Sequence, residues 1–253
     1  MGFTIKNFED NDDVEMSQEY GPFRIVEYIR DLSCTPSEAQ LKYYMSQMDV
    51  LKRQLLCDLN GGGIILSPGA MQWVVGDIQQ TTGIRGVGDA VGKFIGGKVT
   101  GEAAIKPEYK GHGIVVTEPS YRHLLPYDLT EWEDGIVVQD GMFYACESNI
   151  KLQVERIKSL SGAVAGGEGL FNLKMKGHGW CILESRVPTE ELITIDLKND
   201  TLKVDGSYAI AWSPSLRFTV ERSGKTLLGS AVSGEGLVNV YSGTGRVIMM
   251  PQV

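Results

Sequence analysis

The chain has 253 residues, 42% of them hydrophobic, and a formal net charge of −8, so it is long and apolar enough to form a substantial core. It has no run near the roughly 18 apolar residues that a transmembrane helix needs, and its first residues carry acids where a signal peptide would carry lysines. We therefore expect a cytoplasmic protein whose four scattered cysteines are reduced core thiols: Cys34, Cys57, Cys146 and Cys181.

The first 22 residues are expected to form a solvated, mobile acidic arm. Residues 1–20 hold six acidic side chains against Lys6 alone, which is a net charge of −5 and leaves −3 for the rest of the chain. A nearly neutral body attracts polyanions weakly, because affinity for nucleic acid comes mostly from neutralising phosphates. We therefore expect no DNA partner, and RNA is the least favoured partner.

Residues 23–60 are predicted to form a strand, a helix and a second strand. The stretch CTPSEAQLKYYMSQM at 34–48 carries helix-start signals, with Thr35 as the N-cap, Pro36 at the first helical position and Glu38 completing a capping box. Four apolar residues then recur on one helical face, so this short helix is expected to pack on the body of the protein: Leu41, Tyr44, Met45 and Met48.

The rest of the chain is predicted to contain three tandem repeats, at 61–128, 129–198 and 199–253. Near its start each repeat has a short apolar run that ends in glycine, namely GIILSPG, GIVVQDG and DTLKVDG. Each later carries a Gly-Glu pair, and a Gly-x-Gly begins 9 or 10 residues after the glycine of that pair. Ordered markers that recur at a fixed period indicate a repeated structural unit.

The repeats predict an all-β fold of three tandem β-sandwich modules. Short β-branched or aromatic runs are separated by glycine turns about every 8–12 residues, as in sandwiches and barrels. A Gly-x-Gly before an apolar strand suits a tight corner with positive φ. The first repeat also carries a glycine-rich insertion at 83–99, predicted as a weak helix. Its GVGDAVGK segment lacks both the spacing and the Ser or Thr of a phosphate-binding loop.

Glu102, Glu168 and Glu235 occupy the same place in the three repeats. They could converge on a shared ligand site, or each could accept backbone N–H bonds at a glycine corner, and we favour the second interpretation. His112 and His178 are equivalent to each other in the same way, but no carboxylate or cysteine stands at metal-ligand spacing beside them. We expect backbone-bonded turn histidines, no metal and no cofactor.

No catalytic constellation is recognisable, so we expect a protein that is not an enzyme. Ser67 lies in Ser-Pro-Gly rather than in a nucleophile elbow, and no paired-carboxylate motif stands out. The four tryptophans have mainly apolar neighbours, which favours packing in the core or at a subunit interface over stacking on RNA bases: Trp73, Trp132, Trp180 and Trp212.

Three stretches, LSPGAMQW (66–73), GGEGLFNL (166–173) and GSAVSGEGLVNVYSGTGRV (229–247), resemble bacterial members of the altered-inheritance-of-mitochondria protein twenty-four family, over about residues 23–250. The resemblance implies a TRAP-like fold, similar to that of the trp RNA-binding attenuation protein, which is a β-sandwich related to double-stranded β-helices. It also implies a homo-oligomer, expected to be a trimer, and mitochondrial relatives in eukaryotes. The family offers no catalytic residues to transfer, and a shared fold alone does not establish RNA binding.

Three hypotheses for the function follow. The first is a non-enzymatic homo-oligomeric scaffold or interaction protein, with a protein partner or a membrane-associated assembly. The second is a small-ligand or metal-binding protein that uses the Gly-Glu and Gly-His-Gly corners. The third is single-stranded RNA binding.

Overall fold

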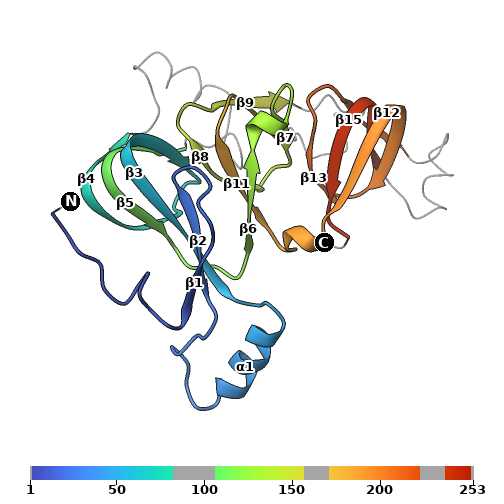
Figure 1. Ribbon diagram of the computed structural model, residues 1–253. Coiled ribbons are helices and arrows are strands. Elements are labelled where there is room, and N and C mark those ends of the chain that lie inside the picture. The colour runs from blue at the N-terminus through green and yellow to red at the C-terminus, as the bar shows by residue number, and fades with distance from the viewer. Residues whose placement is uncertain (1, 82–105, 157–170, 223–236, 252–253) are drawn as a thin grey trace.

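The computed structural model describes residues 2–81, 106–156, 171–222 and 237–251. The chain is all-β with one short N-terminal helix, as predicted, and its strands form two curled antiparallel sheets (Figure 1). The insertion at 83–99 and the three Gly-Glu pairs lie outside the described residues.

The first sheet runs in the order β1 (Val14–Met16), β2 (Phe23–Tyr28), β3 (Lys52–Leu66), β8 (Phe143–Glu147), β11 (Trp180–Ser185) and β6 (His123–Asp128). Two further strands extend it from β3, namely β5 (Glu108–Thr117) and its partner β4 (Met71–Thr81). The second sheet runs in the order β12 (Ile193–Asp205), β15 (Leu237–Met249), β13 (Ala209–Trp212), β7 (Ile136–Val138), β10 (Phe171–Lys176) and β9 (Lys151–Arg156), and β14 (Arg217–Arg222) pairs with β15.

The middle of the chain contributes strands to both sheets. β6, β8 and β11 belong to the first sheet, whereas β7, β9 and β10 belong to the second. Two 3-10 turns, Leu129–Glu131 and Thr189–Glu191, lie in the connections. The second predicted repeat therefore does not form a sheet of its own; it joins the two sheets, and three lobes lie side by side in Figure 1. The boundaries proposed for the repeats stay a prediction.

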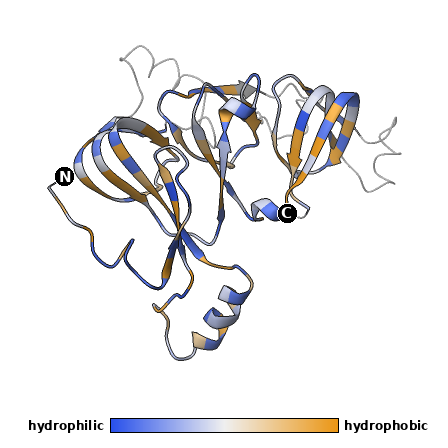
Figure 2. Cartoon of the chain, in the orientation of Figure 1, coloured by the Kyte–Doolittle hydropathy of each residue, from blue (hydrophilic) through white to orange (hydrophobic). Residues whose placement is uncertain are grey.

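Three clusters of buried apolar side chains fill the three lobes. One contains Phe23 and Leu55 of the first sheet, and another contains Tyr241 of the second. The central cluster takes residues from both sheets, such as Leu183 of β11 and Ile248 of β15, so burial of apolar surface holds the sheets together there. Hydrophobic and hydrophilic residues alternate along many strands in Figure 2, as expected for strands with one buried face.

The tryptophans pack against other side chains, as predicted. Trp132 and Trp212 are buried in the clusters. Trp73 contacts Phe8 with 5.7 Å between ring centroids, and Trp180 is partly buried against the cluster of the first sheet.

The repeated glycines have the conformations expected of tight corners. Gly69, Gly141 and Gly206 end the first marker of each repeat, and their φ angles are 78°, 83° and 65°. Both glycines of each Gly-x-Gly also have positive φ, for example 136° at Gly111 and 121° at Gly179. A backbone conformation that other residues resist therefore recurs at equivalent places in the three repeats.

Residues 2–20, expected as a solvated arm, pack along the first sheet instead. Phe8 is buried in a further apolar cluster on the first sheet, and Phe3 and Ile5 pack against that cluster. β1 pairs with β2, and Arg24 binds the Glu9 carboxylate at 2.7 Å. Apolar side chains placed between the acids supply this packing, which net charge alone does not reveal.

α1 (Ala39–Gln47) begins later than predicted and does not pack on the sheets. The Glu38 carboxylate accepts hydrogen bonds from the Thr35 backbone N–H at 3.0 Å and from its hydroxyl at 2.8 Å, which is part of the predicted capping box. No residue of α1 is buried, and the helix projects from the first sheet in Figure 1. The predicted packing of its apolar face on the body is therefore wrong.

All four cysteines are free thiols. Cys57, Cys146 and Cys181 are buried, and burial raises the pKa of each of these thiols. Cys34 is only partly buried and so does not belong to the core. Within the described ranges, no helix combines the length and the apolar content that crossing a membrane requires.

Replacing Gly111 by alanine should strongly destabilise the fold. A Cβ atom at this position would lie 2.0 Å from the Asp77 carbonyl oxygen, and a φ of 136° is unfavourable for alanine. We expect the free energy of unfolding, measured by urea denaturation, to fall by about 2–4 kcal/mol. Gly62→Ala is the matched control, because its Cβ would meet no atom within 4 Å, and it should change stability by less than about 0.5 kcal/mol. Equal losses in both variants would contradict this account of the corner.

Candidate functional site

The two predicted histidines lie at different glycine corners. His112 is in β5, opposite Asn60 and Asp77, whereas His178 lies between β10 and β11 in the middle lobe. Both side chains are exposed. In the part of the chain that the structure describes, no three His, Cys, Asp or Glu side chains gather in a way that would hold a metal ion. The three predicted glutamates lie outside these ranges.

Two side-chain hydrogen bonds clamp the Gly-x-Gly corner of the second repeat. Glu147 Oε1 accepts from the Trp180 backbone N–H at 2.8 Å. Asn149 Nδ2 donates to the His178 carbonyl at 2.9 Å; this bond involves the backbone of His178 and not its imidazole ring. The Tyr20 ring covers the corner and lies 5.1 Å from the Trp180 ring between centroids.

The corner of the third repeat has the same two bonds, formed by different side chains. Ser213 Oγ accepts from the Arg246 backbone N–H at 2.9 Å, and Ser215 Oγ donates to the Thr244 carbonyl at 2.8 Å. The Arg246 guanidinium lies over the Trp132 ring, 5.8 Å from its centroid. Trp132 and Arg246 therefore stand where Tyr20 and Trp180 stand at the other corner.

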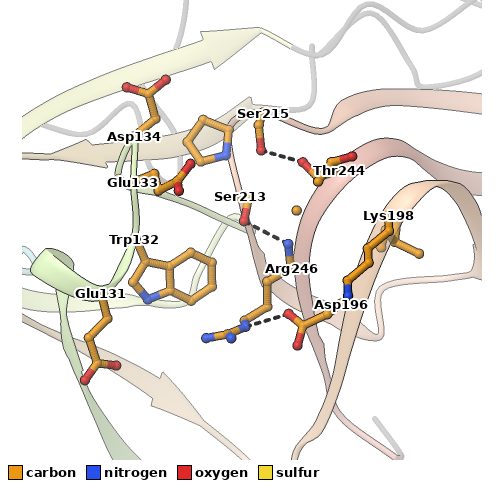
Figure 3. A pocket seen from close by; sticks show the side chains of 14 residues that line it. Glu131, Trp132, Glu133, Asp134, Asp196, Lys198, Ser213, Ser215, Thr244 and Arg246 are labelled. Atoms are coloured by element: carbon orange, nitrogen blue, oxygen red, sulfur yellow. Dashed lines mark hydrogen bonds and ion pairs between the residues drawn. The ribbon is translucent and has the colours of Figure 1, made fainter.

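A pocket of about 400 Å³ opens beside this third corner (Figure 3). The Arg246 guanidinium lies over the Trp132 ring, and Arg246 Nε binds Asp196 Oδ1 at 2.9 Å. Glu133 and Ser213 also line the space. An aromatic ring, a guanidinium, a hydroxyl and carboxylates can hold a small polar ligand by ring contact and hydrogen bonds.

The acidic wall of the pocket is partly neutralised. Lys176 Nζ binds Asp134 at 2.8 Å, and this hydrogen bond lowers the pKa of the Asp134 carboxyl. Glu131, Glu133 and Lys198 form no ion pair with any described residue. These three side chains are therefore available to a ligand.

Sequence reasoning treated Trp132 as a packing residue and did not single out Arg246. The available signal is the alignment of the repeats. ESN at 147–149 of the second repeat falls in register with SPS at 213–215 of the third. The side chains that bond to the Gly-x-Gly corner therefore recur at the same place in both repeats. The pocket itself has no sequence signature, because its walls come from loops and strands far apart in the chain.

A second candidate site is the apolar surface around α1. Among the described residues, seven of the eleven large hydrophobic side chains that are exposed lie on α1 or beside it, and they are 41–76% exposed. We call this set the α1 surface: Leu32, Leu41, Tyr43, Tyr44, Met48, Val50 and Tyr121. Apolar residues gathered in this way mark interaction sites on soluble proteins.

Charged residues connect α1 to loops of the first sheet. Asp31 accepts hydrogen bonds from Lys42 at 2.5 Å and binds Lys52 at 2.9 Å, and Lys42 also binds the Tyr121 hydroxyl at 2.8 Å. Burial alone would raise the pKa of Asp31, but the hydrogen bonds from the two lysines outweigh it, so that pKa is lowered. The bond to Asp31 raises the pKa of Lys42. The two lysines beside α1 thus share one carboxylate, which offsets one of their two positive charges.

Arg53 anchors Asp49, the second residue after the end of α1. Its guanidinium is buried and binds Glu27 at 2.5 Å and Asp49 at 2.6 Å. His123 Nδ1 lies 3.7 Å from Asp49. Burial and then the charge of Arg53 lower the pKa of His123, although Asp49, Glu27 and Glu190 act in the opposite direction.

Comparisons with known proteins identify relatives over most of the chain. The family model described as Mitochondrial biogenesis AIM24 matches residues 48–252. An uncharacterised protein of Streptococcus pyogenes serotype M6 is 24% identical over 196 residues, which are 74% of this chain and 76% of the relative. An X-ray crystal structure of a Streptococcus pyogenes protein has a TM-score of 0.58 at 21% identity, covering 94% of this chain and 92% of its own. At that identity the likeness shows a shared fold, and neither name states an activity.

Stability should fall as the pH drops below 6.5, and His123 should account for part of the loss. Because the folded state lowers the pKa of His123 below 6.5, its full contribution is present above that pH and is lost as the pH falls towards the folded pKa. Urea denaturation at about pH 7.5 and about pH 5.5 measures the loss. His123→Gln should lose less stability over this interval than the unmodified protein. Identical losses would show that His123 is not involved.

Proposed function

This chain belongs to the AIM24 family, described as Mitochondrial biogenesis AIM24, and we propose that it acts as a non-enzymatic homo-oligomeric scaffold. The α1 surface is the contact between copies. The names of the two relatives described above state no activity, so the proposal is based on the physical chemistry of this surface.

The observation that carries the proposal is a short helix that buries none of its own residues. α1 has nine residues, and isolated helices shorter than about 12–15 residues are marginal in water. Its stability in a protein should therefore come from packing of an apolar face. Tyr43, Tyr44 and Met48 are more than half exposed, so this packing requires a second molecule.

The chemistry of the α1 surface favours another copy of the chain over a membrane or a nucleic acid. Tyrosine and methionine are enriched at protein interfaces, whose cores are depleted of charge. Lys42 and Lys52 are paired with Asp31, and Arg53 is paired with carboxylates. An anionic lipid surface or a phosphate backbone would need free positive charge there.

The number of copies constrains how the α1 surface is used. In a twofold dimer, α1 can pack against α1 of the second copy. In the trimer expected from the family resemblance, it must pack against a different face of the next copy, because a threefold axis makes heterologous contacts. We propose the trimer.

The experiment is light scattering coupled to size exclusion on the full chain. The unmodified protein should have a mass three times that of the 27.7 kDa chain. Met48→Glu and Leu41→Glu introduce a charge at exposed positions, so they should give folded monomers with an unchanged circular dichroism spectrum. Val154→Glu is the matched control, an exposed apolar residue on β9 outside the α1 surface, and it should keep the oligomer.

A monomeric unmodified protein would refute the scaffold proposal. Oligomers that survive both α1 substitutions would refute the assignment of the contact to the α1 surface.

Small-ligand binding is the second candidate function, supported by the pocket beside Trp132 and Arg246. If it is correct, gently purified protein should release a stoichiometric small molecule on denaturation, identified by mass spectrometry. Arg246→Ala should reduce the amount released, because it removes the guanidinium that lies on Trp132 and binds Asp196. Ser46→Ala, on the exposed helix, should not. Empty protein in every preparation would count against this function.

A further inference from the structure

A second, smaller cavity lies where the two sheets meet, and it contains two arginines. Its volume is about 220 Å³. Arg122 precedes β6, and Glu184 and Arg186 lie in and directly after β11, so these come from the first sheet. Gln139 and Ser207 come from turns of the second sheet. Cavities between packed units are common ligand sites.

The pairing of β6 with β11 brings the two arginines together. The register ends with Ser185 opposite His123, so Arg186 and Arg122 are the next residues on the two segments. Both line the same cavity. Like charges that face each other across neighbouring strands destabilise a sheet. Arg186 has no ion-pair partner in the described part of the chain, so a repulsive pair stands at the mouth of a cavity.

Glu184 is the one carboxyl among the described residues of the lining, and it offsets this positive charge incompletely. Burial raises the pKa of Glu184, and the nearby Arg122 charge and a hydrogen bond with Ser120 oppose the rise without cancelling it. A carboxyl with a raised pKa takes up a proton more readily. With two guanidinium groups and one carboxyl, the lining carries more positive than negative groups.

We propose that this cavity binds a small oxyanion, a carboxylate or a phosphate group, between the guanidinium groups of Arg122 and Arg186. The planar fork of arginine matches such groups with two parallel hydrogen bonds. The Ser207 hydroxyl supplies a further donor from the second sheet. The volume of about 220 Å³ is below the 300 Å³ at which pockets for drug-sized ligands begin, so it suits an ion or a short acid and excludes a nucleotide.

Part of the remaining wall is apolar. Met142 and Met250 line the cavity beside the charged groups, and flexible thioether side chains adapt to short alkyl chains. A bound oxyanion would also connect the two sheets, because its ligands come from both. Binding should therefore raise thermal stability as well as release heat.

The test titrates sodium phosphate and, separately, sodium butyrate into the full chain in a chloride buffer at constant ionic strength. Isothermal titration should show one site per chain for at least one of the two anions, and the same anion should raise the melting temperature until the effect saturates. Saturation by phosphate alone assigns a phosphate group, and saturation by butyrate alone assigns a carboxylate.

Arg186→Gln should weaken the affinity by at least about tenfold, because one charge-assisted pair of hydrogen bonds is lost. In chloride alone this variant should have the same melting temperature as the unmodified protein or a higher one, because the repulsion between residue 186 and Arg122 is removed. Such a melting transition would also show that the variant folds. Arg217→Gln, an exposed arginine on β14 outside the cavity, is the control and should titrate normally. No saturation with either anion, or equal affinities in all three proteins, would overturn the proposal.

Discussion

Both sheets bend at Gly-x-Gly corners, and at the corner of the first sheet two backbone segments lie in close contact. A Cβ atom on Gly113 would lie 2.1 Å from the Val75 carbonyl oxygen, so only glycine permits the approach. Opposite the corners, β3 shifts register between Asn60 and Gly63, and β12 shifts between Leu197 and Asp200. Such irregularities bend a strand and increase its twist. The curl that lets each sheet enclose its own apolar cluster therefore begins at these glycines.

The curled sheets meet through strands of the middle repeat, and this junction sets the position of the two pockets described above. The central cluster consists of apolar side chains from both sheets. Trp132, Met142 and Met250 lie at its margin, and each lines one of the two pockets. The pockets thus open where the shared core ends and charged loop residues begin.

The sequence predicted the all-β fold and the positive-φ corners, because glycine spacing reports directly on backbone conformation. It was less informative about what each helix, strand or loop packs against. An apolar face on α1 was evident, but the same pattern describes a helix that packs on its own chain and one that packs on another. Net charge suggested a free N-terminal arm, although Phe8 is buried on the first sheet and Phe3 packs against the same apolar cluster. Arg122 and Arg186 meet only through strand register, which no local pattern shows.

The Gly-x-Gly corners of the second and third repeats show which residues the fold requires and which are free to serve a function. Each needs an acceptor for the N–H after the Gly-x-Gly, and Glu147 and Ser213 both provide it. Glu147 also reaches the N-terminal turn, since a Cβ on Gly21 would lie 3.0 Å from its carboxylate oxygen. Ser213 meets the backbone requirement with a smaller side chain, and the space beside it belongs to the pocket lined by Trp132. The fold therefore constrains the glycines and the hydrogen-bond acceptor of each corner. The neighbouring side chains can differ from one repeat to the next and so can form a binding site in one of them.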